Sequence, residues 1–299
     1  MASPTTLVAV GDVEADRERA LDAAETAVAM VATTCSRFDP ASDLSRLNAQ
    51  AELPTMVSPT AHAVISAALS AYRRTIGRFD PRVIGDLERF GYDRSFERIE
   101  GRELAVAEPA AARGEWRPLL GTTEPSVDLR GERIDLGGIA KGFAADLAAD
   151  ELVLRGLGGL IDLGGDGRVV GVDEDGETFR IGIEDPQGSS EPLAVFGLLE
   201  GAYATSSTRL RSWKIGSTPV HHLIDPSTGR PGGGGMLSVT VIGERAAAAE
   251  VDAKVAFLVG RSAIADHVAR QGLAALWVDV DGVVGYSPSF ARHLVWMRP

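Results

Sequence analysis

The residues at positions 134–142, Ile-Asp-Leu-Gly-Gly-Ile-Ala-Lys-Gly, combine groups that hold anions in proteins. Asp135 closes an apolar run, Gly137 and Gly138 follow it, and Lys141 precedes an alanine-rich segment. Glycine lacks the Cβ that keeps a ligand away from the backbone, and the first N–H groups of a helix have no partner within that helix. A lysine ammonium beside such a turn favours phosphate binding. The spacing matches neither of the common glycine-rich nucleotide motifs, so a helix cap with a surface lysine explains it equally well.

Two further motifs place an aromatic ring at a proline-bearing turn. Phe38 lies in Ser-Arg-Phe-Asp-Pro, and Phe79 with Asp80 lies in Gly-Arg-Phe-Asp-Pro. Proline fixes the backbone of such turns. An exposed ring there offers a face to a planar ligand, whereas a buried ring only packs against the core. We expect Phe38 to be exposed.

The remaining chemistry-bearing residues are histidines, acids and a lysine. His221 and His222 precede Ile224 in a strand edge that ends at an Asp-Pro turn, where a histidine acts either as a general base or as a structural hydrogen-bonding group. Glu250 and Lys254 lie four residues apart, a spacing that places them on one face of a helix. An ordinary ion pair is the simplest interpretation of that spacing.

Hydrophobic periodicity and turn residues predict the elements that position these groups. Ser42 or Asp43 is expected to cap a short helical turn, and Ser58 to cap the next helix. We expect a hairpin at 127–129 and 132–136 that leads into the central turn. Helices are predicted at 14–38, 59–74, 140–155, 246–259 and 263–270. Strands are predicted at 7–10, 169–172, 178–183, 193–199, 202–204, 237–242 and 274–279, with one final strand, and a further apolar strand within 156–167 ends at a glycine pair.

Composition restricts the class of protein. The chain of 299 residues is 44% apolar and 24% charged, which is typical of a globular protein with a full core. Its formal charge of −12 disfavours nucleic-acid binding. The single cysteine, Cys35, excludes an intrachain disulfide and a thiolate metal cluster. We predict one domain over 1–299 and a cytoplasmic protein, because no run approaches the length of a membrane span.

Taken in order, these motifs resemble the ApbE-like family of FAD:protein FMN transferases, formerly called thiamine-biosynthesis lipoproteins. The resemblance runs from about residue 7 to residue 282 and rests on the order of the motifs. They are Ser-Arg-Phe-Asp-Pro, Gly-x-Phe-Asp-Pro, Asp-Leu-Gly-Gly-Ile-Ala-Lys-Gly, Leu-Gly-Gly-Asp, Ala-Thr-Ser, His-x-Ile-Asp-Pro-x-Thr-Gly and a Val-Thr-Val strand before an alanine-rich helix. The resemblance implies an α+β fold related to T-folds, with antiparallel sheets backed by helices and a ligand cleft between subregions.

The resemblance also implies the reaction and its residues. Such enzymes cleave FAD, attach FMN to a threonine or serine hydroxyl of an acceptor protein and release AMP, with Mg²⁺ at the pyrophosphate. Phe38 would lie against the isoalloxazine ring, Asp135 and Lys141 would hold the ribose or phosphates, and His222 would orient or deprotonate the acceptor hydroxyl. The FAD-binding residues carried over by the motifs are Phe38, Phe79, Asp80, Asp135, Lys141 and Ile224.

The sequence departs from the family at the metal. In the family, Mg²⁺ is bound by a glycine carbonyl, an aspartate and a threonine. The glycine corresponds to Gly138 here, but Glu250 replaces the aspartate and Lys254 replaces the threonine. Glutamate can bind Mg²⁺, but a protonated lysine has no lone pair. The family's opening Met-Gly-Thr is also absent. We therefore expect an FMN transferase with altered metal dependence. The alternatives are an FAD carrier or sensor without transferase activity, and a nucleotide or sugar-phosphate binding protein that shares only the glycine turns.

Overall fold

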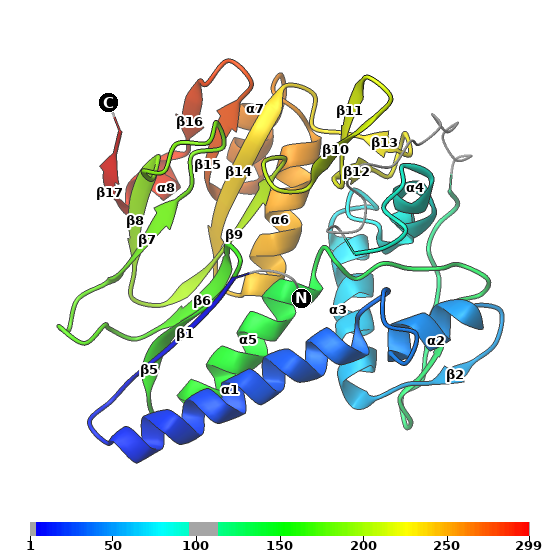
Figure 1. The fold of residues 1–299 in the computed structure, drawn as a ribbon, viewed down its shortest axis with the longest axis horizontal. Coiled ribbons are helices and arrows are strands. Elements are labelled where there is room, and N and C mark those ends of the chain that lie inside the picture. The colour runs from blue at the N-terminus through cyan, green and yellow to red at the C-terminus, as the bar shows by residue number, and fades with distance from the viewer. Residues whose placement is uncertain (1–3, 96–112, 299) are drawn as a thin grey trace. The chain divides into compact units, whose positions relative to one another are not determined.

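A computed structural model describes residues 4–95 and 113–298. The chain forms two compact units that interleave along the sequence (Figure 1). Unit 1 comprises residues 1–30, 141–209 and 234–299, and unit 2 comprises residues 31–140 and 210–233. The chain passes from unit 2 to unit 1 between residues 140 and 141, within the glycine-containing motif at residues 134–142.

Unit 1 is built on a seven-stranded sheet in which all neighbouring strands are antiparallel. Its strands, in spatial order, are β1 (Thr5–Val10), β5 (Gly158–Leu163), β6 (Asp166–Val170), β9 (Gly201–Ser207), β14 (Met236–Gly243), β15 (Ala274–Asp279) and β16 (Val284–Tyr286). The β-branched residues of β14 suit a strand that is paired on both edges. The predicted strand at 274–279 is confirmed with the same bounds, and the strand predicted within 156–167 is confirmed as β5.

A second, three-stranded antiparallel sheet packs against the first. It contains β17 (Leu294–Met297), β8 (Ala194–Leu198) and β7 (Phe179–Ile183) in that order. Phe196 of β8 is fully buried, with its ring 5.4 Å from that of Tyr203 on β9 and 5.8 Å from that of Phe290. Phe290 belongs to α8 (Pro288–Ala291). The prediction of one final strand was therefore wrong, because α8 and β17 follow β16.

The helices of unit 1 are α1 (Glu14–Thr34), α5 (Ala140–Val153), α6 (Ala246–Leu258) and α7 (Ile264–Gln271), with the last four residues of α1 assigned to unit 2. α6 packs on β9 and β14, and Figure 1 shows α5 beside it. Alanines dominate the buried faces of both helices. Small side chains let two helices approach closely. This close packing explains why the sequences of α5 and α6 are rich in alanine.

The closest approach is at Gly142, and it carries a prediction. A Cβ on Gly142 would lie 2.4 Å from the carbonyl oxygen of Ala246. Because backbone atoms cannot move aside cheaply, we expect Gly142→Ala to destabilise the protein by about 1–3 kcal/mol. Thermal or urea unfolding measures the loss.

The matched control is Gly85→Ala in α4 (Ile84–Arg89), where an added Cβ meets nothing within 4 Å. This variant is expected to stabilise the helix by about 0.5–1 kcal/mol, since alanine loses less backbone entropy than glycine. Equal unfolding midpoints for the two variants would contradict the role assigned to Gly142.

Unit 2 contains α2 (Asp43–Ala49), α3 (Pro59–Arg74), the 3₁₀ turn η1 (Pro81–Val83) and α4. Ser42 caps α2 by accepting from Ser45 N, and Ser58 caps α3 by accepting from Ala61 N, so both predicted caps are confirmed. The strands of unit 2 are short. They form one sheet of β2 (Thr55–Met56), β4 (Ser126–Asp128) and β3 (Leu119–Leu120) and two hairpins, β10 (Ser212–Ile215) with β11 (Thr218–His221) and β12 (Ile224–Asp225) with β13 (Arg230–Pro231).

The predicted hairpin at 127–129 and 132–136 was wrong. Residues 132–136 form no strand, and β4 pairs instead with β2 and β3. The side chain of Asn48 takes the place of a strand. Its Nδ2 donates to Ile134 O at 2.8 Å, and its Oδ1 accepts from Ile134 N at 2.9 Å. The alternating pattern reflects the burial of Ile134 and Leu136 and not the hydrogen bonding of two paired strands.

Among residues 4–95 and 113–298, no helix combines the length and the apolar character required to cross a membrane.

Candidate functional site

An exposed aromatic ring in unit 2 lies beside an apolar cluster. Phe38 is 39% exposed, as expected, and its ring centroid is 5.7 Å from that of Tyr92. Tyr92 is 5.7 Å from Trp213 and packs in one buried cluster with Ile224. The structure therefore brings together Phe38 and Ile224, which lie far apart in the sequence, through Tyr92. An open ring backed by apolar side chains suits a planar aromatic ligand.

Arg37 links this ring to the central turn, and the sequence analysis missed it. Its guanidinium carbon is 4.2 Å from the ring centroid of Phe38 and 4.6 Å from that of Tyr92. Its Nε is 3.2 Å from Asp135 Oδ1. The only available signal was the position of Arg37 directly before Phe38, because nothing in the sequence pairs residue 37 with residue 135.

The backbone of Asp135 is fixed by a hydrogen bond, and the turn after it leaves room for the carboxylate. Asp135 N donates to Pro81 O at 2.7 Å, which fixes the start of the turn. A Cβ on Gly137 would lie 3.1 Å from Asp135 Oδ2, so glycine at this position leaves room for the carboxylate. Gly138, the predicted carbonyl ligand, is buried in the same turn, just before α5.

Asp80 is buried and its carboxylate is already satisfied. Arg82 Nε donates to Asp80 Oδ1 at 3.0 Å, Arg82 Nη2 donates to Oδ2 at 2.7 Å, and Arg82 N donates to Oδ1 at 2.9 Å. Phe79 beside it is only 3% exposed. These two residues shape the turn that positions Asp135 through Pro81, and direct contact with a ligand stays a prediction for both.

The hydrogen bond at Nδ1 of His222 selects one tautomer of the neutral ring. Its Nδ1 lies 3.3 Å from the carbonyl oxygen of Arg211, which also accepts from His222 N at 3.3 Å. Because a carbonyl only accepts, Nδ1 must carry the proton of a neutral ring that makes this bond. Nε2 then keeps a lone pair with which to accept a proton. The half-buried His222 thus has the tautomer that a general base requires.

Lys141, in unit 1, lies among carboxylates. Its ammonium forms an ion pair with Asp166 Oδ2 and is 3.8 Å from Glu250 Oε1. Asp166 is 1% exposed, and its Oδ1 accepts from Thr205 N at 3.1 Å. The sequence analysis assigned Lys141 to the ribose or phosphates and named Leu-Gly-Gly-Asp only among the motifs of the family, so it did not predict this ion pair.

Glu250 and Asp146 join α5 and α6 reciprocally. Glu250 Oε2 on α6 accepts from Gly142 N at 2.8 Å, one of the N–H groups without a partner inside α5. Asp146 on α5 accepts from the first two N–H groups of α6, Ala246 N at 2.8 Å and Ala247 N at 3.0 Å. Burial raises the pKa of Asp146, although these two hydrogen bonds act in the opposite direction.

The donor set predicted for Mg²⁺ does not make a complete site on chemical grounds. Glu250 retains lone pairs beyond those used by Gly142 and Lys141, but a protonated Lys254 offers none. Within residues 4–95 and 113–298, no three His, Cys, Asp or Glu side chains converge as metal ligands do. Gly138 lies in unit 2 and Glu250 with Lys254 in unit 1.

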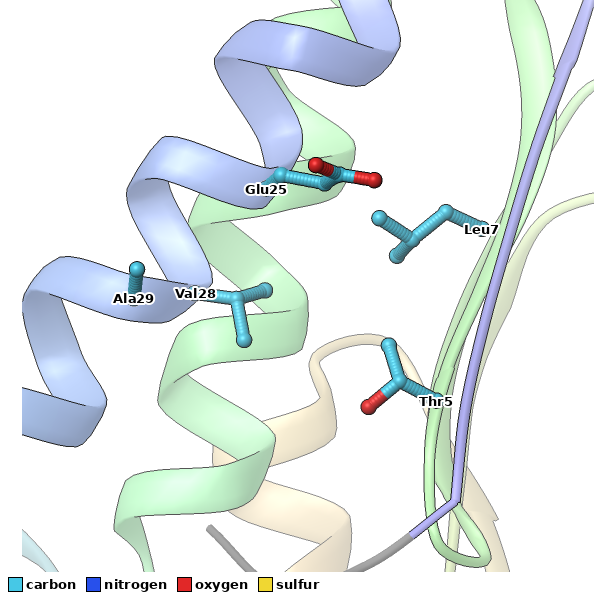
Figure 2. Close-up of a pocket in the computed structure, with 5 residues that line it drawn as sticks. All are labelled: Thr5, Leu7, Glu25, Val28 and Ala29. Atoms are coloured by element: carbon cyan, nitrogen blue, oxygen red, sulfur yellow. The ribbon is translucent and has the colours of Figure 1, made fainter.

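A hollow of about 390 Å³ lies in unit 1 between β1 and α1 (Figure 2). Figure 2 shows Leu7 and Thr5 of β1 facing Glu25 and Val28 of α1, with Ala29 beside them. Its one charged residue is an acid, so it offers no cation to a diphosphate. None of its five lining residues is among the predicted site residues.

The comparisons with known proteins agree with the order of the motifs. The FAD:protein FMN transferase of Vibrio cholerae is 31% identical over 214 residues, which cover 69% of this chain and 63% of that protein. The FAD:protein FMN transferase of Treponema pallidum is 28% identical over 238 residues, which cover 73% of this chain and 65% of that protein. The chain thus spans somewhat less than two thirds of these two relatives.

The fold has solved counterparts over its whole length. The crystal structure of the ApbE protein from Thermotoga maritima has a TM-score of 0.85 and 26% identity, covering 99% of this chain and 96% of that one. A mutant of the flavin transferase ApbE from Vibrio cholerae has a TM-score of 0.77 at 23% identity, covering 98% and 100%, and supports the fold alone. The α+β fold with antiparallel sheets backed by helices is confirmed. The family profile matches residues 1–277, and the chain therefore belongs to the ApbE family.

Proposed function

We propose that this protein is an FAD:protein FMN transferase, which moves FMN from FAD to a threonine or serine hydroxyl of an acceptor protein and releases AMP. Family membership along nearly the whole chain supports the activity. The observation that carries the chemistry is the hydrogen bond between His222 and the Arg211 carbonyl, which leaves Nε2 able to accept a proton.

In the proposed reaction the acceptor hydroxyl oxygen attacks the phosphorus of the FMN half of the pyrophosphate. A new P–O bond forms, the bond to the AMP phosphate oxygen breaks, and AMP leaves. His222 Nε2 takes the hydroxyl proton. Such a reaction needs positioning and charge neutralisation more than covalent participation by the protein. Lys141 is the proposed cation for the phosphates, and the pyrophosphate then competes with Asp166 for its ammonium.

Phe38 is the proposed stacking surface for the isoalloxazine ring, with Tyr92 and Ile224 behind it. Asp135 would bind the ribose or the phosphate region, and Phe79 with Asp80 would line the flavin pocket. We treat residues 1–299 as one functional domain. The proposed partners are FAD and an acceptor protein, and the proposed location is the cytoplasm. Neither nucleic acid nor membrane is a proposed partner, in keeping with a net charge of −12.

A second possibility is a carrier or sensor that binds FAD without transferring FMN. A carrier needs the ring and phosphate contacts but not the tautomer of His222. One assay distinguishes a transferase from a carrier. The protein is mixed with FAD and a threonine-bearing acceptor peptide, and peptide mass and AMP release are measured together. Added FMN mass with stoichiometric AMP supports transfer, whereas bound FAD without either product supports the carrier.

We further propose that metal dependence is altered, because Lys254 stands where a threonine is expected. Lys254→Thr is expected to create or strengthen a dependence of transfer on Mg²⁺, since it replaces a cation by a neutral oxygen ligand. Transfer rates in EDTA and in Mg²⁺ are compared for the wild type and the variant.

The control for this substitution is Lys214→Thr, which removes an exposed lysine on β10 and should leave the metal response of the wild type unchanged. If Lys254→Thr and the wild type respond identically to Mg²⁺ and EDTA, Lys254 has no part in the metal dependence.

A further inference from the structure

We propose that Arg37 is a positioning residue for FAD, which holds the Phe38 ring and the Asp135 carboxylate on one guanidinium and donates its free Nη2 to an oxygen of bound FAD. The inference rests on the proposed function, because it assigns a new role within the proposed FAD site. All the residues that carry it belong to unit 2.

The contacts of Arg37 are to two groups predicted to bind different parts of the ligand. The guanidinium carbon is 4.2 Å from the Phe38 ring centroid, within the range of a cation–π contact, and Nε is 3.2 Å from Asp135 Oδ1. The Arg37 side chain is only 6% exposed, so these contacts are shielded from water and salt. One rigid, planar group therefore sets both the tilt of the ring and the position of the carboxylate.

The second observation is an unmet donor. Arg37 Nη2 is buried and has no hydrogen-bond partner among the described residues. A buried donor on a charged group costs free energy when no acceptor meets it, so such groups are rare in native proteins and call for an explanation. One explanation is that a bound ligand supplies the missing acceptor. FAD carries carbonyl and phosphate oxygens that can accept this hydrogen bond.

Arg82 and Arg133 of unit 2 differ from Arg37 in this respect, whereas Arg89 also has a buried Nε without a hydrogen-bond partner. Arg82 uses Nε, Nη1 and Nη2 on Asp80, Glu132 and Gly114 O. Arg133 places both Nη groups on Glu88. Arg37 lies over two neighbouring rings and reaches one carboxylate through Nε, which leaves Nη2 for another acceptor. The exposed Phe38 ring contacts the guanidinium, so a ligand that binds against Phe38 also lies close to Arg37.

The test uses the full chain and FAD itself. Arg37→Met keeps the length of the side chain and removes the charge, and Arg37→Lys keeps the charge and removes the planar fork. We expect Arg37→Met to raise both the FAD Kd and the KM for FAD about tenfold with kcat within about twofold, the pattern of a lost binding interaction. Arg37→Lys should recover part of the affinity. Arg133→Met, on an exposed ion pair of the same unit, should match the wild type.

A double-mutant cycle with Asp135→Asn separates positioning from independent contact. If Arg37 acts through Asp135, the double variant loses less affinity than the product of the single losses. Flavin fluorescence reports stacking on Phe38 in each variant, and thermal midpoints show that the variants are folded. A Kd for Arg37→Met within about twofold of the wild type, or losses that simply multiply, would overturn the inference. If the wild type itself bound no FAD, the proposed function would fall and this inference with it.

Discussion

His222→Ala is expected to lower the rate of FMN transfer by at least about 100-fold and to leave FAD binding within about twofold of the wild type. The imidazole is the proposed proton acceptor, because the bond of Nδ1 to Arg211 O places the lone pair of a neutral ring on Nε2. Alanine removes the base without touching the predicted contacts to the flavin ring. Peptide mass and AMP release measure transfer, and equilibrium ultrafiltration with FAD measures binding.

The matched control for this variant is the neighbouring histidine. His221 Nδ1 accepts from Leu223 N at 3.3 Å, and burial lowers the pKa of His221, so this ring is neutral at pH 7. His221→Asn keeps an acceptor near the same place and should transfer FMN at close to the wild-type rate. Normal transfer by His222→Ala would remove the role proposed for His222, and equal losses in both variants would point to a folding defect.

Lys141→Met is expected to destabilise the protein by about 3–5 kcal/mol, because it removes one partner of a buried ion pair. Asp166 is 1% exposed and would keep the hydrogen bond from Thr205 N without a cation beside it. Glu250, 3.8 Å from the ammonium, would lose a favourable charge as well. Transfer should fall too, since the proposed phosphate cation is gone. Chemical unfolding of unliganded protein measures the stability effect apart from ligand binding.

A second substitution tests the cause of that loss. Asp166→Asn removes the charge and retains an oxygen that can accept from Thr205 N. The double variant Lys141→Met with Asp166→Asn should therefore recover much of the lost stability but none of the transfer. Lys214→Met, on the exposed face of β10, should change stability by no more than about 0.5 kcal/mol. A double variant no more stable than Lys141→Met would show that the cost lies in packing and not in the unpaired carboxylate.

Local chemistry made several parts of the fold predictable. Ser42 and Ser58 cap their helices as predicted because an N-cap acts only on the next three residues. β15 was predicted with its final bounds and β5 as an apolar strand before a glycine pair, because apolar runs bounded by turns are recognisable without a distant partner. The exposure of Phe38 followed from its place in a proline turn.

Residues 132–136 show where such reasoning fails. Their alternation of apolar and polar residues is typical of a strand, yet their backbone partner is the side chain of Asn48. Asn48 is 86 residues away in sequence, and a single asparagine carries no signal of what it binds. The alternation predicted correctly that Ile134 and Leu136 are buried, but predicted wrongly that this segment pairs with a strand.

The sequence by itself determined the family, most of the helices and longer strands, and the kinds of side chain at the site, because each rests on residue type, short-range periodicity or the order of motifs. Only the tertiary structure decided which charges meet. Arg37 with Asp135 and Lys141 with Asp166 join segments that are distant in the chain, and the tautomer of His222 depends on the carbonyl of Arg211. The physical reason is that ion pairs and hydrogen bonds act over a few ångströms in space, whatever the separation along the chain.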